Sequence, residues 1–188
     1  MNIDQLYSRL SYVNHSRTMR LEMAELILTN PELVRPLLEI SFRFNDPISA
    51  RACWVLEFTA RKDPRYLDLH LDLWANNLSG LRLESSIRPM AKICEILVLE
   101  YYSSTRTSGR SALTIKHLQL IATACFDWLI GPHKVAPKAY SITSLYHLGK
   151  DFDWVHTELQ LLLENEYSEA SAAFKARARE VLSKLRNR

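Results

Sequence analysis

Two glutamates stand out because each lies at the same position of an otherwise apolar stretch. Glu57 is the seventh residue of RACWVLEF, and Glu95 is the seventh residue of PMAKICEI; Ser144 holds that position in KAYSITSL. Two carboxylates that lie close together can perform general acid–base catalysis or bind a basic peptide. A carboxylate at the flank of a packed helix can equally form an ion pair with a neighbouring Arg or Lys. Both interpretations of this pair stay open at the level of sequence.

The same three stretches agree in other columns, which indicates an internal repeat. The fifth position is β-branched and apolar and the eighth is large and apolar, as in Val55, Ile93, Ile142, Phe58, Ile96 and Leu145. Successive copies are offset by 38 and 49 residues, and a fainter fourth copy with Arg179 in its fifth column follows 37 residues later. Repeats of this period are typical of stacked helix pairs. Such a stack would place Glu57 and Glu95 near one another along one side.

The first third of the chain contains three dipeptides in which Asn or Asp precedes proline: Asn30-Pro31, Asp46-Pro47 and Asp63-Pro64. Each pair predicts a helix start, because Asp or Asn accepts unpaired backbone N–H groups and proline suits the first helical turn. Periodicity and capping residues along the rest of the chain predict about ten helices in five antiparallel pairs. The polar segment SSTRTSGRSA, residues 103–112, reads as an insertion that explains the longer offset. We therefore predict one all-α domain over residues 1–188.

The segment at residues 67–73 is ambiguous, because its leucines alternate strictly with polar residues as in a half-buried strand. Leucine nevertheless favours helices, and a lone strand would have no partner. One helical face also collects large apolar side chains, namely Leu67, Leu71, Trp74 and Leu78. We predict helix here.

Composition narrows the class of protein. The 188 residues are 47% hydrophobic and 24% charged, which is ordinary for a globular domain, and a formal net charge of +3 is too small to imply nucleic-acid binding. Apolar runs are too short for a membrane span, and the start MNIDQLYSRL has no apolar signal region. The three separated cysteines indicate reduced core residues. We expect a cytoplasmic protein.

Motifs for cofactors and metals are missing from the sequence. The four glycines are widely separated, so no glycine-rich phosphate loop can form. The six histidines have no HxxxH or HExxH spacing, and no CxxC accompanies them. We predict no cofactor and no sequence-local metal site.

The fragment LLEISFRFNDPISARACWVLEF, residues 37–58, resembles a HEAT repeat: an apolar helix, an Asp in the turn, and a second helix opening with a basic residue. Asp46 and Arg51 stand where that family has its turn Asp and second-helix Arg, and the resemblance implies that they bond between neighbouring repeats. Two further segments, SIR ending at Arg88 and APK ending at Lys138, look like the same opening, although Arg88 is one place early and Lys138 replaces Arg.

The whole chain is similar to a group of bacterial HEAT-like proteins of about this length, through YVNHSR, WVLEF, RPMAKICE, ACFDWLI and KAYSITSLYHLG. These resemblances imply an αα-superhelix of the HEAT or armadillo type. Some similar sequences carry the name adenylosuccinate lyase, whose flexible serine loop is nearest to SSIRPMAK, residues 85–92. Here the glycine is missing, Met and Pro are reversed, and no Asn-Pro follows. The lyase is also more than twice as long, so the sequence argues against that activity.

A helical-repeat fold leaves an extended surface that is typically used to bind proteins or peptides. We therefore predict a non-enzymatic scaffold or adaptor with a protein or peptide partner and no membrane contact. The second helices of the pairs should line the binding face, with the two glutamates and the basic residues exposed. The candidate residues of this face are Glu57, Glu95, Arg51, Arg88, Lys138 and Trp54.

Two alternatives remain. HEAT-like alkylpurine DNA glycosylases line a concave surface with aromatic and basic residues and an Asp, and Asp127-Trp128 is the nearest local match here. Tryptophans at helical spacing also pack in cores, however. The other alternative is an enzyme that uses Glu57 and Glu95, which would require both acids to line a closed pocket.

Overall fold

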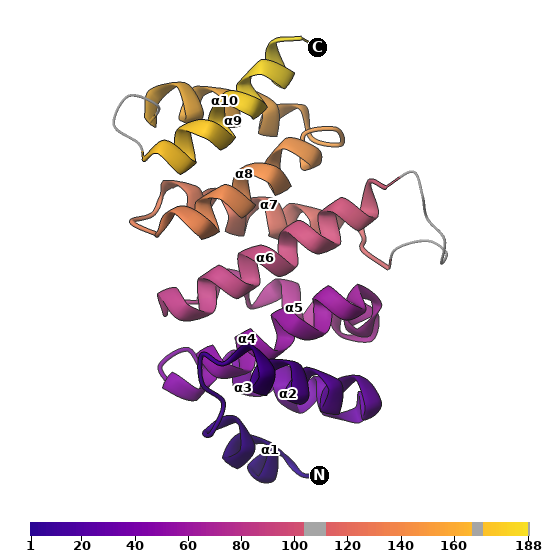
Figure 1. The fold of residues 1–188 in the computed structure, drawn as a ribbon. Helices are drawn as coiled ribbons and strands as arrows, with labels where there is room; N and C mark the ends of the chain where they lie inside the picture. The colour runs from indigo at the N-terminus through magenta and orange to yellow at the C-terminus, as the bar shows by residue number, and fades with distance from the viewer. Residues whose placement is uncertain (104–111, 167–170, 188) are drawn as a thin grey trace.

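The computed structural model describes residues 1–103, 112–166 and 171–187. These ranges hold ten α-helices and three 3-10 helices and contain no strand, so the all-α prediction is confirmed. Figure 1 shows the helices stacked from the N-terminus at the bottom to the C-terminus at the top. Residues 104–111 of the predicted insertion lie outside the described residues. No described helix is both long enough and apolar enough to cross a bilayer.

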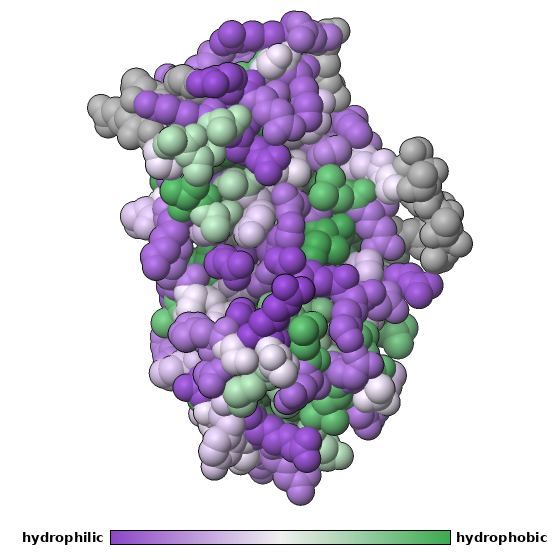
Figure 2. Space-filling view, in the orientation of Figure 1, coloured by the Kyte–Doolittle hydropathy of each residue, from purple (hydrophilic) through white to green (hydrophobic). Residues whose placement is uncertain are grey.

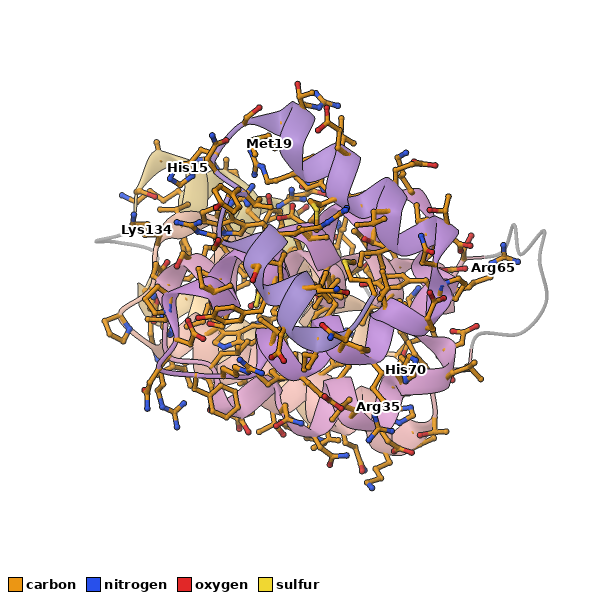
Figure 3. The ribbon with its side chains drawn as sticks, turned by 90° about the horizontal axis from the view of Figure 1, so that it is seen from below. His15, Met19, Arg35, Arg65, His70 and Lys134 are labelled. Atoms are coloured by element: carbon orange, nitrogen blue, oxygen red, sulfur yellow. The ribbon has the colours of Figure 1, made fainter. Side chains whose placement is uncertain are left out.

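Five helices pack on one another in chain order and form what we call the second-helix layer. They are α2 (Arg17–Thr29), α4 (Pro47–Lys62), α6 (Glu84–Tyr101), α8 (Val135–Leu148) and α10 (Ala172–Arg186). We call the helix that precedes each of these in the chain a member of the first-helix layer: α1 (Ile3–Leu10), α3 (Val34–Ser41), α5 (Leu71–Asn76), α7 (Ile115–Ile130) and α9 (Asp153–Glu166). In Figure 3, His15 and Met19 mark the α2 side of the stack, and Arg35 and His70 mark the opposite side.

Local capping explains several helix starts. The Asp46 carboxylate accepts a hydrogen bond from the Ile48 backbone N–H at 2.9 Å and begins α4, as predicted. Asp63 caps in the same way but begins a 3-10 helix, Pro64–His70. Asn30 behaves differently, because its side chain donates to the Leu26 carbonyl at 2.8 Å and so ends α2. The 3-10 helix Pro31–Leu33 then begins without a side-chain cap.

The ambiguous leucine segment is helical, first as the 3-10 helix at 64–70 and then as α5. Leu67, Leu71 and Trp74 are buried on one face, whereas Leu69 is 92% exposed. A half-buried strand would have buried Leu69 together with its alternate neighbours. A third 3-10 helix, Leu78–Gly80, leads toward α6 and continues the buried face with Leu78.

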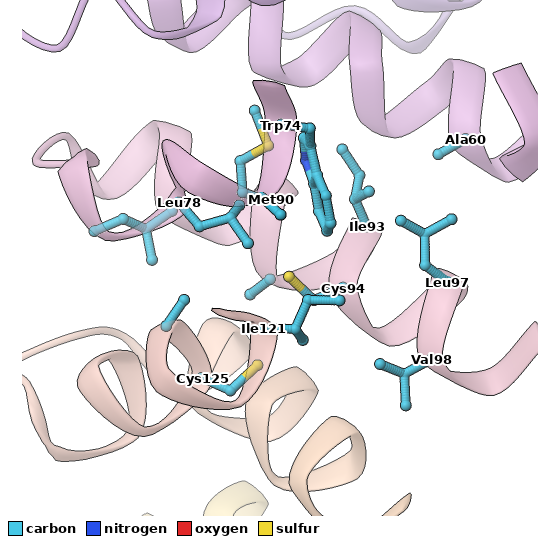
Figure 4. Close-up of a cluster of buried hydrophobic side chains, with 14 of the residues drawn as sticks. Ala60, Trp74, Leu78, Met90, Ile93, Cys94, Leu97, Val98, Ile121 and Cys125 are labelled. Atoms are coloured by element: carbon cyan, nitrogen blue, oxygen red, sulfur yellow. The ribbon is translucent and has the colours of Figure 1, made fainter. Parts of the chain in front are cut away.

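The repeat columns mark the core of the second-helix layer. Val55, Ile93 and Ile142 are fully buried, as is Leu145, while Phe58 and Ile96 are half-buried. Figure 4 shows side chains of α6, including Met90, Ile93 and Cys94, gathered with Trp74 of α5 and with Ile121 and Cys125 of α7. The fourth copy departs from the column, because Arg179 is exposed and α10 instead buries Phe174, Ala178 and Val181.

The three cysteines are free and buried. Burial raises the pKa of Cys53 to about 12, so this thiol stays protonated at neutral pH. The prediction that the cysteines lie in the core is confirmed.

Candidate functional site

Glu57 lies on α4 at the contact with α6, and its side chain is 1% exposed. Its Oε1 accepts hydrogen bonds from Arg61 Nη2 at 2.6 Å and from Arg61 Nε at 3.1 Å. Its Oε2 accepts a hydrogen bond from Arg88 Nη1 of α6 at 3.2 Å. The expectation that Glu57 is exposed is wrong, because α6 packs over this face of α4 and two guanidinium groups replace the water around the carboxylate.

Glu95 is also buried, at 5% exposure, which corrects the same expectation for the second carboxylate. It forms an ion pair with Lys92 on its own helix, and the Lys92 ammonium lies 4.8 Å from the centre of the Tyr140 ring on α8. The two glutamates are therefore held by different cations, as the ion-pair interpretation describes. Ser144, the third member of the column, uses its hydroxyl to donate to the Tyr140 carbonyl of its own helix at 3.0 Å.

The basic residues that open the second helices connect neighbouring helix pairs. Arg51 donates to the Ser11 carbonyl just beyond α1. Arg88 binds Glu57 across the α4–α6 contact, and Lys138 of α8 lies 3.6 Å from Glu166 at the end of α9. Each predicted residue thus reaches another pair, Arg51 and Arg88 backward along the chain and Lys138 forward.

Asp46 also acts beyond its own helix. It caps α4, and its carboxylate raises the pKa of the Tyr7 phenol on α1. Asp46 therefore interacts with α1, and Arg51 binds the carbonyl just after that helix.

Trp54 of α4 is half-buried and contacts α6, α2 and the segment before α2. Its indole N–H donates to the Ser85 carbonyl at 2.9 Å, and its ring centre lies 4.9 Å from that of His15. The Arg20 guanidinium lies over the same ring at 6.0 Å. Trp128, by contrast, is 3% exposed inside the core, while the adjacent Asp127 is exposed. That pair consequently offers no shared aromatic and acidic surface.

Around these residues α2, α4 and α6 form an open pocket of about 470 Å³. We call it the basic pocket, and its walls are Arg17, Arg20, Leu21, Glu57, Phe58, Arg61, Lys62 and Arg88. Sequence reasoning found Glu57 and Arg88 but missed the other four cations. The spacing of Glu57 and Arg61, four residues apart on one helix, could have indicated their ion pair. Arg17 and Arg20 carried no such indication, because they come from a different helix.

A row of cations over aromatic rings crosses the second-helix layer, and we call it the cation–aromatic row. Arg20 lies 4.8 Å from the Phe58 ring centre, Lys92 lies 4.8 Å from Tyr140, and Lys184 of α10 lies 5.6 Å from Tyr146. In the face drawn in Figure 2, strongly hydrophilic side chains gather across the middle, over the region where Figure 1 places α6, with apolar patches beside them.

Beside this row, His147 of α8 is half-buried and stacks on Tyr102 with ring centres 6.1 Å apart. The Tyr102 hydroxyl donates to Asp151 at 2.7 Å. Burial lowers the pKa of His147, and the positive charges of Lys150 and Lys184 lower it further.

Among the described residues, no group of three or more His, Cys, Asp or Glu is placed to hold a metal ion. No protein-family model, curated protein or solved structure matches the chain. The function is therefore argued from the geometry of the second-helix layer and its basic pocket.

Proposed function

We propose that this chain is a HEAT-like, armadillo-type αα-superhelix of about five helix pairs that acts as a non-enzymatic scaffold. Its docking surface is the exposed side of the second-helix layer, and its occupant is a protein or peptide segment. The scaffold would work in the cytoplasm, where buried thiols such as Cys53 remain reduced.

The observation that carries this proposal is the cation–aromatic row. Its members come from α2, α4, α6, α8 and α10, so every helix of the layer contributes a cation or a ring to it. Aromatic and arginine side chains are enriched where proteins bind one another, because they offer large contact areas and directed hydrogen bonds. Two acids of the layer, Glu57 and Glu95, are buried, whereas Arg61 and Arg88 remain 44% and 43% exposed. The surface therefore suits a partner segment that carries acidic residues.

The same contacts argue against the enzyme alternative. General acid–base catalysis needs a carboxylate that can reach a substrate proton. Glu57 is enclosed by two guanidinium groups, and Glu95 is covered by the Lys92 ammonium. These acids serve to position cations.

Site-specific photo-crosslinking tests the scaffold in the cells that make it. A benzoylphenylalanine at Leu21 or Leu99 would face the docking surface, since Leu21 lines the basic pocket and Leu99 is exposed about three turns beyond Arg88 on α6. Matched positions at Glu39 of α3 and Thr123 of α7 are exposed on the first-helix layer. We expect one protein adduct from the first two positions and none from the controls. Adducts from the control positions alone would overturn the proposal.

Nucleic-acid binding is the second candidate, and it relies on the same cations together with the half-buried Trp54 ring beside Arg20. Treating the adducts with nuclease and with protease separates the two functions. Adducts that become smaller after nuclease treatment and keep their size after protease treatment would support the nucleic-acid function and contradict a protein partner.

A further inference from the structure

We propose that the basic pocket is a binding site for a doubly charged oxyanion of the phosphate monoester type. The site lies between α2, α4 and α6 at one end of the docking surface. It is additional to the scaffold function, and it would stand even if the second-helix layer bound no protein. The inference is carried by the charge of the pocket, the unused donors of its arginines and the way in which these arginines are held.

The pocket has a large excess of positive charge. Five cations line it, and the only carboxylate among its walls is Glu57. Glu25 of α2 adds one acid beside Lys62, with which it forms an ion pair. Five cations against two carboxylates leave an excess of three positive charges around the pocket. A carboxylate ligand would leave most of this excess uncompensated, whereas a dianion removes two-thirds of it.

The guanidinium groups keep donors available for such a ligand. Arg61 uses Nε and Nη2 for Glu57, and Arg88 uses Nη1 for the same carboxylate. Arg20 uses Nε and Nη2 for the carbonyls of Ser16 and His15, at 3.2 and 2.6 Å. Among the residues that the structure describes, no hydrogen bond occupies the remaining nitrogens. Arginine forks bind phosphate oxygens through charge-assisted hydrogen bonds, and several forks can share one tetrahedral anion.

Most of these donors are already positioned. The buried carboxylate of Glu57 holds Arg61 and Arg88 through hydrogen bonds. Arg20 is held by hydrogen bonds to two backbone carbonyls and by its contact with the Phe58 ring. Less side-chain entropy is therefore lost when a ligand binds. Arg17 differs, because it is exposed at the first residue of α2 and makes no ion pair with any described residue. It is therefore a cation of the pocket whose charge no carboxylate of the described residues compensates, and it is available to an anion.

Two sources could supply this chemistry: a free phosphate ion, or a phosphorylated side chain on a bound segment. Isothermal titration calorimetry would use inorganic phosphate, the peptide acetyl-Ala-Ala-phosphoserine-Ala-Ala-amide and its unphosphorylated form. Acetate at matched ionic strength controls for screening. We expect inorganic phosphate to bind one site with a dissociation constant below about 1 mM, and acetate to give no saturable heat. Binding of the phosphopeptide in addition identifies a side-chain source, and binding of inorganic phosphate alone identifies the free ion.

Arg17→Gln is the decisive variant, because Arg17 is exposed and its removal leaves the Glu57 ion pairs intact. We expect it to weaken phosphate binding about tenfold. Lys116→Gln is the matched control, since Lys116 is an exposed cation in the first turn of α7, in the other layer, and should bind phosphate like the unaltered chain. Equal binding by both variants, or no saturable binding by the unaltered chain, would overturn the site. Neither result would affect the photo-crosslinks of the scaffold.

Discussion

The two glutamates of the repeat column show how a buried charge is accommodated. A carboxylate without water is costly unless cations and hydrogen bonds replace its hydration. Glu57 has three such hydrogen bonds from two arginines, one on its own helix and one on α6. Glu95 has the Lys92 ammonium, which the Tyr140 ring covers from the other side. At the scale of single residues, these acids stabilise the layer and orient its cations.

Glu57→Gln should lower the free energy of unfolding by about 2 kcal/mol. The amide would turn an N–H donor toward the guanidinium donors of Arg61 or Arg88 and leave it without an acceptor. Urea denaturation measures the loss. Glu39→Gln is the control, because its ion pair with Arg35 is exposed and its removal should cost less than about 0.5 kcal/mol. Equal losses in the two variants would show that the burial of Glu57 adds nothing.

At the scale of elements, the turn from α8 to α9 depends on the absence of a side chain at Gly149. The backbone φ of Gly149 is −63°, so the residue caps α8 in the ordinary right-handed region. Glycine is required here for steric reasons, because a Cβ atom at this position would lie 2.1 Å from His156 Cδ2. The same imidazole makes a 2.8 Å hydrogen bond to the Tyr146 carbonyl, which holds the start of α9 against α8.

Gly149→Ala should therefore lower the free energy of unfolding by about 1–3 kcal/mol through steric conflict with His156. In a His156→Ala background the same change should cost less than about 0.5 kcal/mol, because the conflicting ring is gone. A double-mutant cycle measured by thermal or urea unfolding gives this coupling. Additive losses would mean that the backbone, rather than the imidazole, demands glycine.

At the scale of the whole molecule, polar contacts connect successive helix pairs in addition to the apolar core. Glu84 of α6 accepts the Lys134 backbone N–H at 3.0 Å, and its other oxygen lies 2.9 Å from His133 Nδ1. His117 of α7 lies 3.1 Å from Asp72 of α5, and Tyr102 bonds Asp151 across the turn after α8. Because such links follow one another along the stack, loosening one pair should weaken its neighbours.

Stability should fall as the pH drops below the ordinary histidine pKa of 6.5, partly through His147. Burial, Lys150 and Lys184 lower the pKa of His147 in the folded chain, although Glu95 opposes this. Between the lowered pKa and 6.5 the unfolded chain therefore binds more protons, and protonation favours unfolding. His147→Phe keeps a ring beside Tyr102 and should flatten this part of the stability–pH curve.

The measurement is the urea midpoint from pH 8 to pH 5 for both chains. His70 also has a lowered pKa, because of burial and Arg35, but it is present in both chains and cancels in the difference. Parallel curves would show that His147 makes no contribution.

The sequence by itself determined the helices and their apolar faces. Asp46 and Thr114 cap α4 and α7 through neighbours two and three residues away, and Val55, Ile93 and Ile142 repeat on one helical face. These are local relations, so a single chain segment contains all the information that they need. The fainter fourth copy departs from this column in the structure as well, because α10 buries Ala178 and exposes Arg179.

The tertiary structure alone decided the site. Arg88 meets Glu57 from 31 residues away, and Arg17 and Arg20 join them from α2. Contacts between helices depend on the relative shift and the crossing angle of the helices. The residue pattern of a single helix contains no information on either quantity. The sequence thus identified two carboxylates in one column, and only the packing of α2, α4 and α6 buried one of them beneath an open cluster of cations.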